Sequence, residues 1–282
     1  MDKQLFITDF DGTLLNDERR ISPMDFKILG QLQDAGVVTA IATGRSMDSF
    51  FKALDQMGLS SEDLPVEYLV FSTGAGVLSL PGRALLLQHD LSREQTCEIC
   101  TYFDGAQLDY MVHRSIPHTR ELIYASHGGE NLDFKRRLAM YSENARPMLG
   151  DLTLFESATQ VLAISPPGIS LDRVGQIQAD LGAFSVIHAT SPLDHASSWI
   201  EVFNPRVSKS QSVDWLAQYV GVLPQNTIAV GNDYNDEDLL EWAGRSFMVD
   251  NGPEDLKGRF IPVASNNESG VAMAVAEAGL LG

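Results

Sequence analysis

Five short segments of the chain are apolar at nearly every position, and they constrain the fold more than any other feature. Runs of this kind suit parallel strands that are covered on both faces, whereas a strand with one face in water alternates apolar and polar residues. We therefore expect a parallel sheet with helices on both sides. The segments are Leu5 to Phe10, Val37 to Thr43, Tyr68 to Ser72, Thr227 to Gly231 and Phe247 to Val249.

A capped amphipathic helix is predicted between the first two segments. Ser22 and Pro23 form a helix start, apolar residues follow at helical spacing, and Gly36 ends the helix. A second helix is expected from about Lys209 to Tyr219, ahead of the strand that begins at Thr227. Strand, helix and strand in this order form a βαβ unit, so both ends of the chain are expected to build one Rossmann-like α/β core.

The middle of the chain has looser apolar runs, and we expect it to be an inserted α+β domain. The turns at Pro81-Gly82 and Ser191-Pro192 set its bounds at about residues 83–190, which leaves residues 1–82 and 191–282 for the core. Its expected strands are Leu85 to Gln88, Leu122 to Tyr124, Val161 to Ile164 and Phe184 to His188, and its expected helices are Arg93 to Phe103, Phe134 to Ser142 and Leu171 to Leu181.

Composition and charge exclude several classes of protein. The net charge of −18 argues against nucleic acid or an anionic membrane as a partner, because both require a basic surface. No apolar run approaches the roughly 20 residues that cross a bilayer, and Asp9 and Asp11 interrupt any signal-like segment at the N-terminus. We expect a cytoplasmic protein.

The two cysteines, Cys97 and Cys100, exclude a disulfide framework and favour a reducing compartment. One C-x-x-C pair cannot complete a tetrahedral zinc site. On a helix the two thiols share a face with Phe103, so we expect them to be buried as small apolar side chains.

Two carboxylates follow the first predicted strand in Asp9-Phe10-Asp11-Gly12-Thr13. Gly12 begins a turn there, so Asp9 and Asp11 can converge on one point. In open α/β sheets, ligands bind beyond the carboxyl ends of the strands. A bare D-x-D is usually a solvated acidic turn, and the surrounding sequence must decide between the two interpretations.

Four motifs in register resemble the haloacid dehalogenase superfamily, and in particular its Cof-type branch. The string D-F-D-G-T-L-L from Asp9 resembles the first motif, and Thr43-Gly44-Arg45 resembles T-G-R at the end of the second strand. Lys209 resembles the lysine motif, and residues 231–236, G-N-D-Y-N-D, resemble the acidic motif G-D-x-x-N-D. The resemblance covers both ends of the chain.

This resemblance implies a Mg²⁺-dependent phosphatase that acts on a small phosphorylated metabolite, such as a sugar phosphate. Asp9 would attack phosphorus to give an aspartyl-phosphate, and Asp11 would protonate the leaving oxygen and then activate water. An acidic protein needs local cations to hold an anionic substrate, which is consistent with a bound metal.

The resemblance also implies a phosphate-binding set and a metal-binding set. Phosphate would be held by Thr43, the Gly44 amide, Arg45, Lys209 and Asn235. Magnesium would be held by Asp9 and the backbone carbonyl of Asp11, with Asp236 in support. The remaining direct ligand is open between Asn232, which an ungapped match places at the family's aspartate position, and Asp233, which would replace it if the turn shifts by one residue.

The chain departs from the family pattern at two places. Arg206 stands where glycine is expected before the lysine, and Ser210 follows the lysine. The Asn-Gly-Ala stretch after the third strand is replaced by Ser72-Thr73-Gly74-Ala75, so an amide contact is lost while Thr73 can still form hydrogen bonds.

The insert resembles the α/β cap of the Cof-type group, which would supply specificity contacts. Among its polar residues, His113, Arg114, His118 and Arg120 are candidate substrate contacts, although scattered surface residues are the more ordinary interpretation. A phosphomutase or phosphotransferase, or a non-catalytic phosphate- or metal-binding regulatory module, remains an alternative. The substrate and the oligomeric state stay open.

Overall fold

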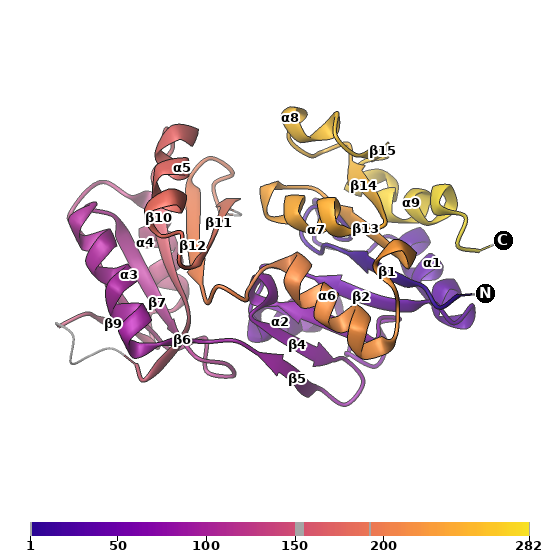
Figure 1. Ribbon diagram of the computed structural model, residues 1–282, viewed down its shortest axis with the longest axis horizontal. Helices are drawn as coiled ribbons and strands as arrows, with labels where there is room; N and C mark the ends of the chain where they lie inside the picture. The colour runs from indigo at the N-terminus through magenta and orange to yellow at the C-terminus, as the bar shows by residue number, and fades with distance from the viewer. Residues whose placement is uncertain (1, 150–154, 192, 282) are drawn as a thin grey trace. The chain divides into compact units, whose positions relative to one another are not determined.

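The computed structural model describes residues 2–149, 155–191 and 193–281. It divides into two compact units (Figure 1). The first comprises Met1–Leu87 and Ser208–Gly282, and the second comprises Gln88–Val207. The chain therefore leaves the first unit and returns to it, as expected for an inserted domain.

The first unit contains an eight-stranded sheet. The six strands from β15 (Ile261–Val263) to β3 (Tyr68–Phe71) run parallel to their neighbours, and β4 (Gly76–Ser79) is antiparallel to β3. The parallel sheet expected from the continuous apolar runs is confirmed. The strand order is β15 (Ile261–Val263), β14 (Arg245–Val249), β13 (Thr227–Gly231), β1 (Leu5–Thr8), β2 (Val38–Ala42), β3 (Tyr68–Phe71), β4 (Gly76–Ser79) and β5 (Ala84–Gln88).

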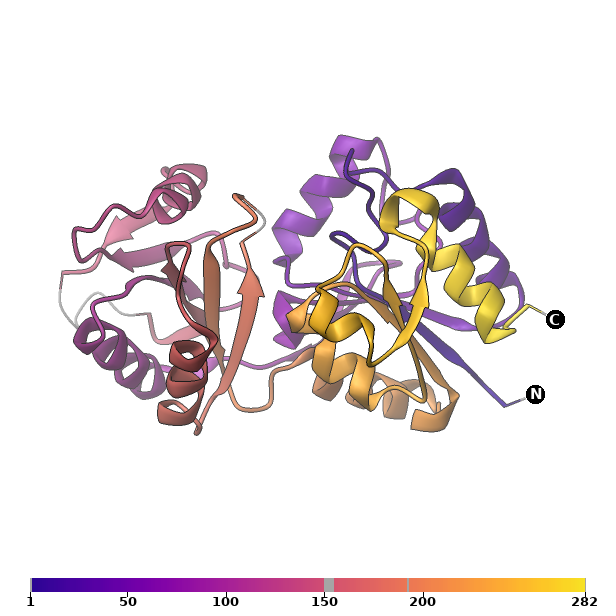
Figure 2. The ribbon, with the colours of Figure 1, turned by 90° about the horizontal axis from the view of Figure 1, so that it is seen from above.

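Helices cover both faces of this sheet (Figure 2). One face carries α1 (Pro23–Asp34), α2 (Met47–Met57) and α9 (Gly270–Ala278). The other carries α6 (Lys209–Val220), α7 (Glu237–Trp242) and α8 (Glu254–Lys257), whose Leu216, Leu239 and Leu256 belong to the same buried apolar cluster as Leu5 and Ile7 of β1. Burial on both faces explains why these strands are apolar at every position.

The predicted helix start at Ser22 is present. The Ser22 hydroxyl accepts a hydrogen bond from the amide of Asp25, and Pro23 occupies the first helical position. Because the central strands are parallel, the loops that follow β1, β2, β3 and β13 leave the sheet at the same edge. All four predicted motifs lie in or next to these loops or at the start of α6.

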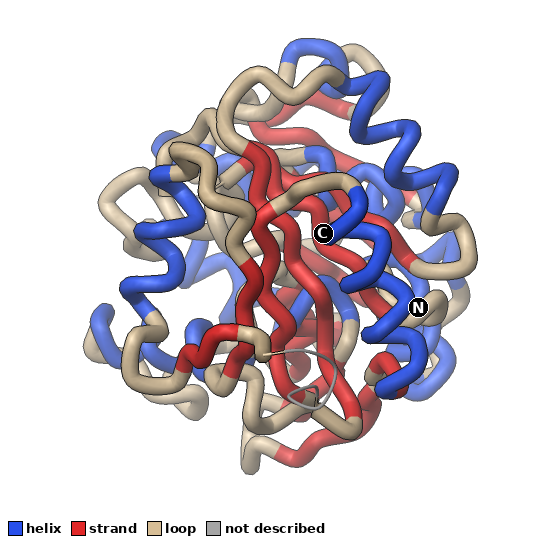
Figure 3. Tube along the Cα trace, turned by 90° about the vertical axis from the view of Figure 1, so that its left-hand side faces the viewer, coloured by secondary structure: helices blue, strands red, loops and turns tan. Residues whose placement is uncertain are grey.

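The second unit is built on a sheet that is antiparallel except for its last pair of strands, which is parallel, and helices cover both faces (Figure 3). The helices α3 (Arg93–Gly105) and α5 (Leu171–Asp180) share one face with Val161, and α4 (Leu132–Met140) covers the other with Leu162. The short β6 (Leu91–Ser92) pairs with β10 (Ser157–Ser165). The strand order is β11 (Ser185–Thr190), β12 (Ser198–Phe203), β10 (Ser157–Ser165), β7 (Asp109–Arg114), β8 (Leu122–Ala125) and β9 (Ala145–Pro147).

The boundaries between the units differ from those expected from turn residues. They lie at 87/88 and 207/208 instead of 82/83 and 190/191. The run at residues 84–88 joins the first sheet as β5, and β12 pairs with β10 and β11 in the second sheet. Strand pairing therefore overrides the turns at both ends of the insert. Pro192 lies outside the described residues.

Both cysteines lie on α3 and neither forms a disulfide, with Cys100 buried and Cys97 partly buried against the same apolar cluster as Phe103. This matches their predicted role as small apolar side chains. Across residues 2–149, 155–191 and 193–281, none of the helices has the length and apolarity needed to cross a bilayer.

Candidate active site

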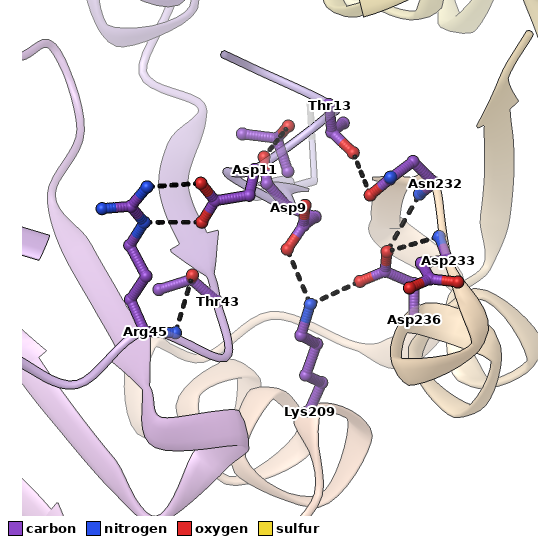
Figure 4. A network of polar contacts seen from close by, with 10 residues as sticks. Asp9, Asp11, Thr13, Thr43, Arg45, Lys209, Asn232, Asp233 and Asp236 are labelled. Atoms are coloured by element: carbon purple, nitrogen blue, oxygen red, sulfur yellow. Dashed lines mark hydrogen bonds and ion pairs between the residues drawn. The ribbon is translucent and has the colours of Figure 1, made fainter. Parts of the chain in front are cut away.

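Lys209 lies between two buried carboxylates (Figure 4). Its Nζ donates a hydrogen bond to Asp9 Oδ1 at 2.7 Å and another to Asp236 Oδ1 at 2.5 Å. Lys209 and Asp236 are fully buried, and Asp9 is 4% exposed. Asp9 follows β1, Lys209 begins α6, and Asp236 follows β13, so three separate segments meet at this ammonium group.

The electrostatics of this trio reflect its burial. Burial, followed by the charge of Asp236, raises the pKa of Asp9 to about 7. Burial alone would lower the pKa of Lys209, but the carboxylates of Asp236 and Asp9 more than offset it and raise that pKa. Lys209 is therefore charged, and one ammonium is shared by two carboxylates.

Asp11 is held by Arg45. Arg45 Nε donates to Asp11 Oδ2 at 2.6 Å, and Arg45 Nη2 donates to Asp11 Oδ1 at 2.5 Å (Figure 4). The guanidinium is further fixed by the carbonyl of Ser49 at 3.3 Å and by the ring of Phe10, whose centroid lies 5.4 Å away. Arg45, which the sequence suggested as a phosphate ligand, is thus engaged with Asp11.

Thr43, Gly44 and Asn235 gather at the ends of β2 and β13. Thr43 is buried, and its Oγ1 accepts a hydrogen bond from the Arg45 amide at 3.1 Å, which leaves the hydroxyl hydrogen able to donate elsewhere. A Cβ placed on Gly44 would lie 3.6 Å from Asn235 Nδ2, so the Asn235 amide faces the glycine backbone. The Asn235 side-chain amide therefore lies beside the Gly44 backbone.

Asn232 reaches Asp9 and Asp11. The terminal atom of its side chain that faces them lies 3.1 Å from the backbone carbonyl oxygen of Asp11 and 3.2 Å from Asp9 Oδ2. The same atom lies 3.1 Å from Thr13 Oγ1. Of the two residues considered for the direct metal position, Asn232 is the one whose side chain meets Asp9 and Asp11.

Asp233 and Asp236 form a reciprocal capping arrangement at the 3-10 turn η4 (Tyr234–Asp236). The Asp233 side chain accepts a hydrogen bond from the backbone three residues on. Asp236 Oδ2 accepts hydrogen bonds from the amides of Asn232 at 2.9 Å and Asp233 at 3.2 Å. Asp236 thus supports both the turn and Lys209, and the Asp233 carboxylate caps the turn.

In the part of the chain that the structure describes, no group of three or more His, Cys, Asp or Glu side chains could hold a metal ion. The predicted ligand set with Asn232, and not Asp233, at its open position does not require one. It combines the carboxylate of Asp9 with a main-chain carbonyl from Asp11 and an amide from Asn232, and Mg²⁺ accepts oxygen ligands of all three kinds.

Two further residues support this site and were not identified from the sequence. Thr13 Oγ1 donates to Asn232, and Asn251 Nδ2 donates to the carbonyl of Gly12 at 2.7 Å. Thr13 belongs to the D-x-D-G-T string and was a recognisable candidate. Asn251 follows β14 at the same sheet edge as the other motif residues, and this position was the one sequence signal that could have identified it.

The four polar residues of the insert named above differ in environment. His113 is buried, donates a hydrogen bond from Nδ1 to the Thr119 carbonyl at 2.8 Å, and has its pKa lowered to about 3, first by burial and then by Arg137. Arg114 pairs with Glu121 at 2.7 Å. His118 and Arg120 are exposed. These residues do not form a common cluster with one another.

Comparison with known proteins identifies the family. A family model for haloacid dehalogenase-like hydrolases matches residues 6–275. The chain belongs to the haloacid dehalogenase-like hydrolases. It is therefore an enzyme of the hydrolase class, and the resemblance noted in its four motifs is confirmed at the level of the family.

Individual members of this haloacid dehalogenase-like family resemble the chain over almost its full length. The 5-amino-6-(5-phospho-D-ribitylamino)uracil phosphatase YitU of Bacillus subtilis is 26% identical over 97% of this chain and 96% of its own. The phosphatase BT1666 of Bacteroides thetaiotaomicron has a TM-score of 0.77 at 15% identity, covering 99% of this chain and 96% of its own. The subclass IIB sugar phosphatase BT4131 has a TM-score of 0.75 at 15% identity, covering 99% and 100%. These structural likenesses establish the shared fold.

Proposed function

We propose that this phosphatase hydrolyses a small phosphorylated metabolite with Mg²⁺ through an aspartyl-phosphate on Asp9. One arrangement carries the proposal: Asp9 is buried and its Oδ1 accepts a hydrogen bond from Lys209, while Asp11, two residues on, is oriented by Arg45. A nucleophile fixed beside a cation, with a second carboxylate in reach of a leaving group, is the constellation that phosphoryl transfer to a side chain requires.

In the first step an Asp9 carboxylate oxygen forms a bond to phosphorus, and the bond from phosphorus to the leaving oxygen breaks. Asp11 donates a proton to that oxygen, so the product leaves as an alcohol. The ammonium of Lys209 and the donors of Thr43 and Gly44 offset the charge that the phosphoryl oxygens carry. The acid role requires Arg45 to release at least one Asp11 oxygen, because both oxygens accept from the guanidinium.

In the second step Asp11 takes a proton from water, whose oxygen forms a bond to phosphorus while the bond from Asp9 to phosphorus breaks. Inorganic phosphate leaves, and Asp9 is regenerated as a carboxylate. Asp11 has given up its proton in the first step, so its side chain is a carboxylate that pairs with Arg45 and can act as a base. The same residue thus serves as acid and then as base.

The charges and oxygen atoms around Asn232 are suited to Mg²⁺. Three carboxylates, of Asp9, Asp11 and Asp236, face two cations, Lys209 and Arg45, which leaves a formal charge of −1. With its oxygen facing inward, Asn232 would place that oxygen 3.1 Å from the Asp11 carbonyl oxygen and 3.2 Å from Asp9 Oδ2 with no hydrogen between them, an arrangement that a small divalent cation satisfies.

Asp9, the Asp11 carbonyl and the Asn232 side chain would hold the ion. Asp236 would support them by accepting a hydrogen bond from the backbone N–H of Asn232. When bound, the ion would neutralise charge on the substrate phosphoryl group. Asp233 is left as a cap of η4 in this assignment.

The substrate class that we propose is a phosphomonoester of a sugar or sugar alcohol. YitU is named for a phosphorylated ribityl compound, and BT4131 is named as a sugar phosphatase. The net charge of −18 disfavours a polyanionic nucleic acid or an anionic membrane as a partner, and it is consistent with a small soluble substrate in the cytoplasm.

A panel of phosphorylated metabolites tests this function. Purified protein is incubated with Mg²⁺ and each compound, and released inorganic phosphate is measured, with EDTA and Asp9→Asn as controls. We expect release from sugar or sugar-alcohol phosphates that stops in both controls. Turnover of no phosphomonoester, or equal turnover by Asp9→Asn, would contradict the proposal. Conversion of one sugar phosphate into its isomer without phosphate release would indicate a mutase.

A further inference from the structure

Asn232 has a side-chain amide whose inner atom meets two groups that only accept hydrogen bonds. That atom lies 3.1 Å from the Asp11 carbonyl oxygen and 3.2 Å from Asp9 Oδ2. An amide presents either an oxygen or an NH₂ group at this point, depending on a rotation of the terminal side-chain torsion. The two settings have opposite chemistry toward the same partners.

With its nitrogen inward, the Asn232 amide donates hydrogen bonds to the Asp11 carbonyl and to Asp9 Oδ2. This setting satisfies both acceptors without a metal. With its oxygen inward, the amide adds a third oxygen to the same two, and these lone pairs repel one another unless a cation lies among them. The inward oxygen is therefore the metal-binding setting.

Thr13 has a hydroxyl group, which can form a hydrogen bond with the Asn232 amide in either setting. Its Oγ1 lies 3.1 Å from the inner atom of the Asn232 amide and is fully buried. A hydroxyl donates to an amide oxygen and accepts from an amide nitrogen, so it keeps a hydrogen bond in either case. The buried Thr13 hydroxyl therefore keeps its hydrogen bond to Asn232 when the amide rotates.

The surroundings of Asn232 allow the amide to rotate while the backbone stays fixed. Its own N–H donates to Asp236 Oδ2 at 2.9 Å, which anchors the main chain. Gly12 leaves the space that the outer end of the amide occupies, because a Cβ there would lie 2.6 Å from it. The positive φ of Gly12, +76°, also favours glycine at this position.

We propose that Asn232 is a two-setting residue that closes the site through its NH₂ group without metal and opens it to Mg²⁺ by turning its oxygen inward. This inference rests on the proposed metal site. An aspartate at the same position has oxygen at both ends, so it binds the ion with an added charge and has no metal-free setting. Compared with aspartate, asparagine therefore binds the metal less tightly but makes the metal-free protein more stable.

The isosteric change Asn232→Asp tests this directly, with thermal unfolding in EDTA and across a Mg²⁺ titration as the readout. In EDTA we expect a melting temperature lower than wild type by about 3 °C or more, because three oxygens then face one another. In Mg²⁺ we expect the variant to recover that loss, with about tenfold tighter apparent binding. Asp233→Asn, which keeps a capping oxygen, is the matched control and should follow wild type in both conditions.

A second variant keeps the test decisive if Asn232→Asp does not fold in EDTA. Asn232→Ala removes both settings, so its melting temperature should fall in EDTA and rise little with Mg²⁺. Equal stability of Asn232→Asp and wild type in EDTA, or an undiminished Mg²⁺ response in Asn232→Ala, would overturn the two-setting proposal alone. Absence of any Mg²⁺-dependent rise in wild type would instead remove the proposed metal site, and this inference with it.

Discussion

Arg45 donates to both carboxylate oxygens of Asp11, through Nε at 2.6 Å and Nη2 at 2.5 Å. A planar guanidinium matches a carboxylate in this two-point geometry, whereas a lysine ammonium acts as a single point charge. The orientation of Asp11 is therefore set by a residue at the end of the neighbouring strand β2. Sequence resemblance had suggested phosphate as the partner of Arg45.

Replacing Arg45 by lysine should separate these two roles. Arg45→Lys keeps a cation but loses the two-point contact, so we expect kcat for an aryl phosphate to fall about tenfold with little change in KM. Arg83→Lys is a control for the loss of a guanidinium that stacks on a phenylalanine ring. Arg83 Cζ lies 4.1 Å from the centroid of the Phe51 ring. An increase in KM at unchanged kcat would instead make Arg45 a phosphate ligand.

Removing the charge of Lys209 should destabilise the first unit strongly. Lys209→Met leaves the buried carboxylates of Asp9 and Asp236 without a counter-ion, which typically costs about 3 to 5 kcal/mol. Urea unfolding measures the difference, and the added change Asp236→Asn should restore part of it. The exposed pair of Lys257 with Glu254 provides the control, since Lys257→Met should cost much less than Lys209→Met. A loss in Lys209→Met as small as that in Lys257→Met would show that the trio is not a buried ion network.

His113 should make the second unit sensitive to acid. Its folded pKa of about 3 lies below the value near 6.5 of an unfolded histidine, so the unfolded chain binds more protons between these values. Stability therefore falls as the pH drops from about 6.5 toward 3, by about 2 kcal/mol at pH 5 relative to neutral pH. The neighbouring Arg137, whose Nη2 lies 3.5 Å from His113 Nε2, adds to the cost of a second positive charge.

The variant His113→Asn keeps a donor for the Thr119 carbonyl and cannot take up this proton. Urea unfolding at pH 7 and pH 5 should show a smaller loss of stability in His113→Asn than in wild type. His118→Asn, at an exposed position, should retain the loss seen in wild type. An identical pH dependence in wild type and His113→Asn would contradict the assignment.

Much of the fold was accessible from local sequence, because burial on both faces leaves a continuous apolar run. The predicted strand Thr227 to Gly231 coincides with β13. The composition of an apolar segment does not determine, however, which strand it pairs with. The segment at residues 199–203 suits either sheet, and only its antiparallel contacts with β10 and β11 place it in the second unit. Turn residues were a poor guide to the domain boundaries for the same reason.

At the site, sequence spacing indicated which residues gather but not how they pair. The structure brings Asp9, Lys209 and Asp236 together, as strand ends at one sheet edge allow. The partner of Arg45 depends on side-chain directions across two loops, which sequence does not specify. The same is true of Thr13, whose hydroxyl reaches a residue 219 positions away in the chain.

Chemical trapping shows whether Asp9 carries the phosphoryl group during turnover. Wild type, Asp9→Asn and Asp11→Asn are mixed with Mg²⁺ and an activated aryl phosphate, quenched in acid within the first turnover, and digested for peptide mass analysis. Such a leaving group needs no proton from Asp11. We predict a phosphorylated Asp9 in wild type and more of it in Asp11→Asn, where hydrolysis lacks its base, and none in Asp9→Asn. Phosphate release by wild type with no label on Asp9 in any variant, or a label that persists in Asp9→Asn, would contradict the account.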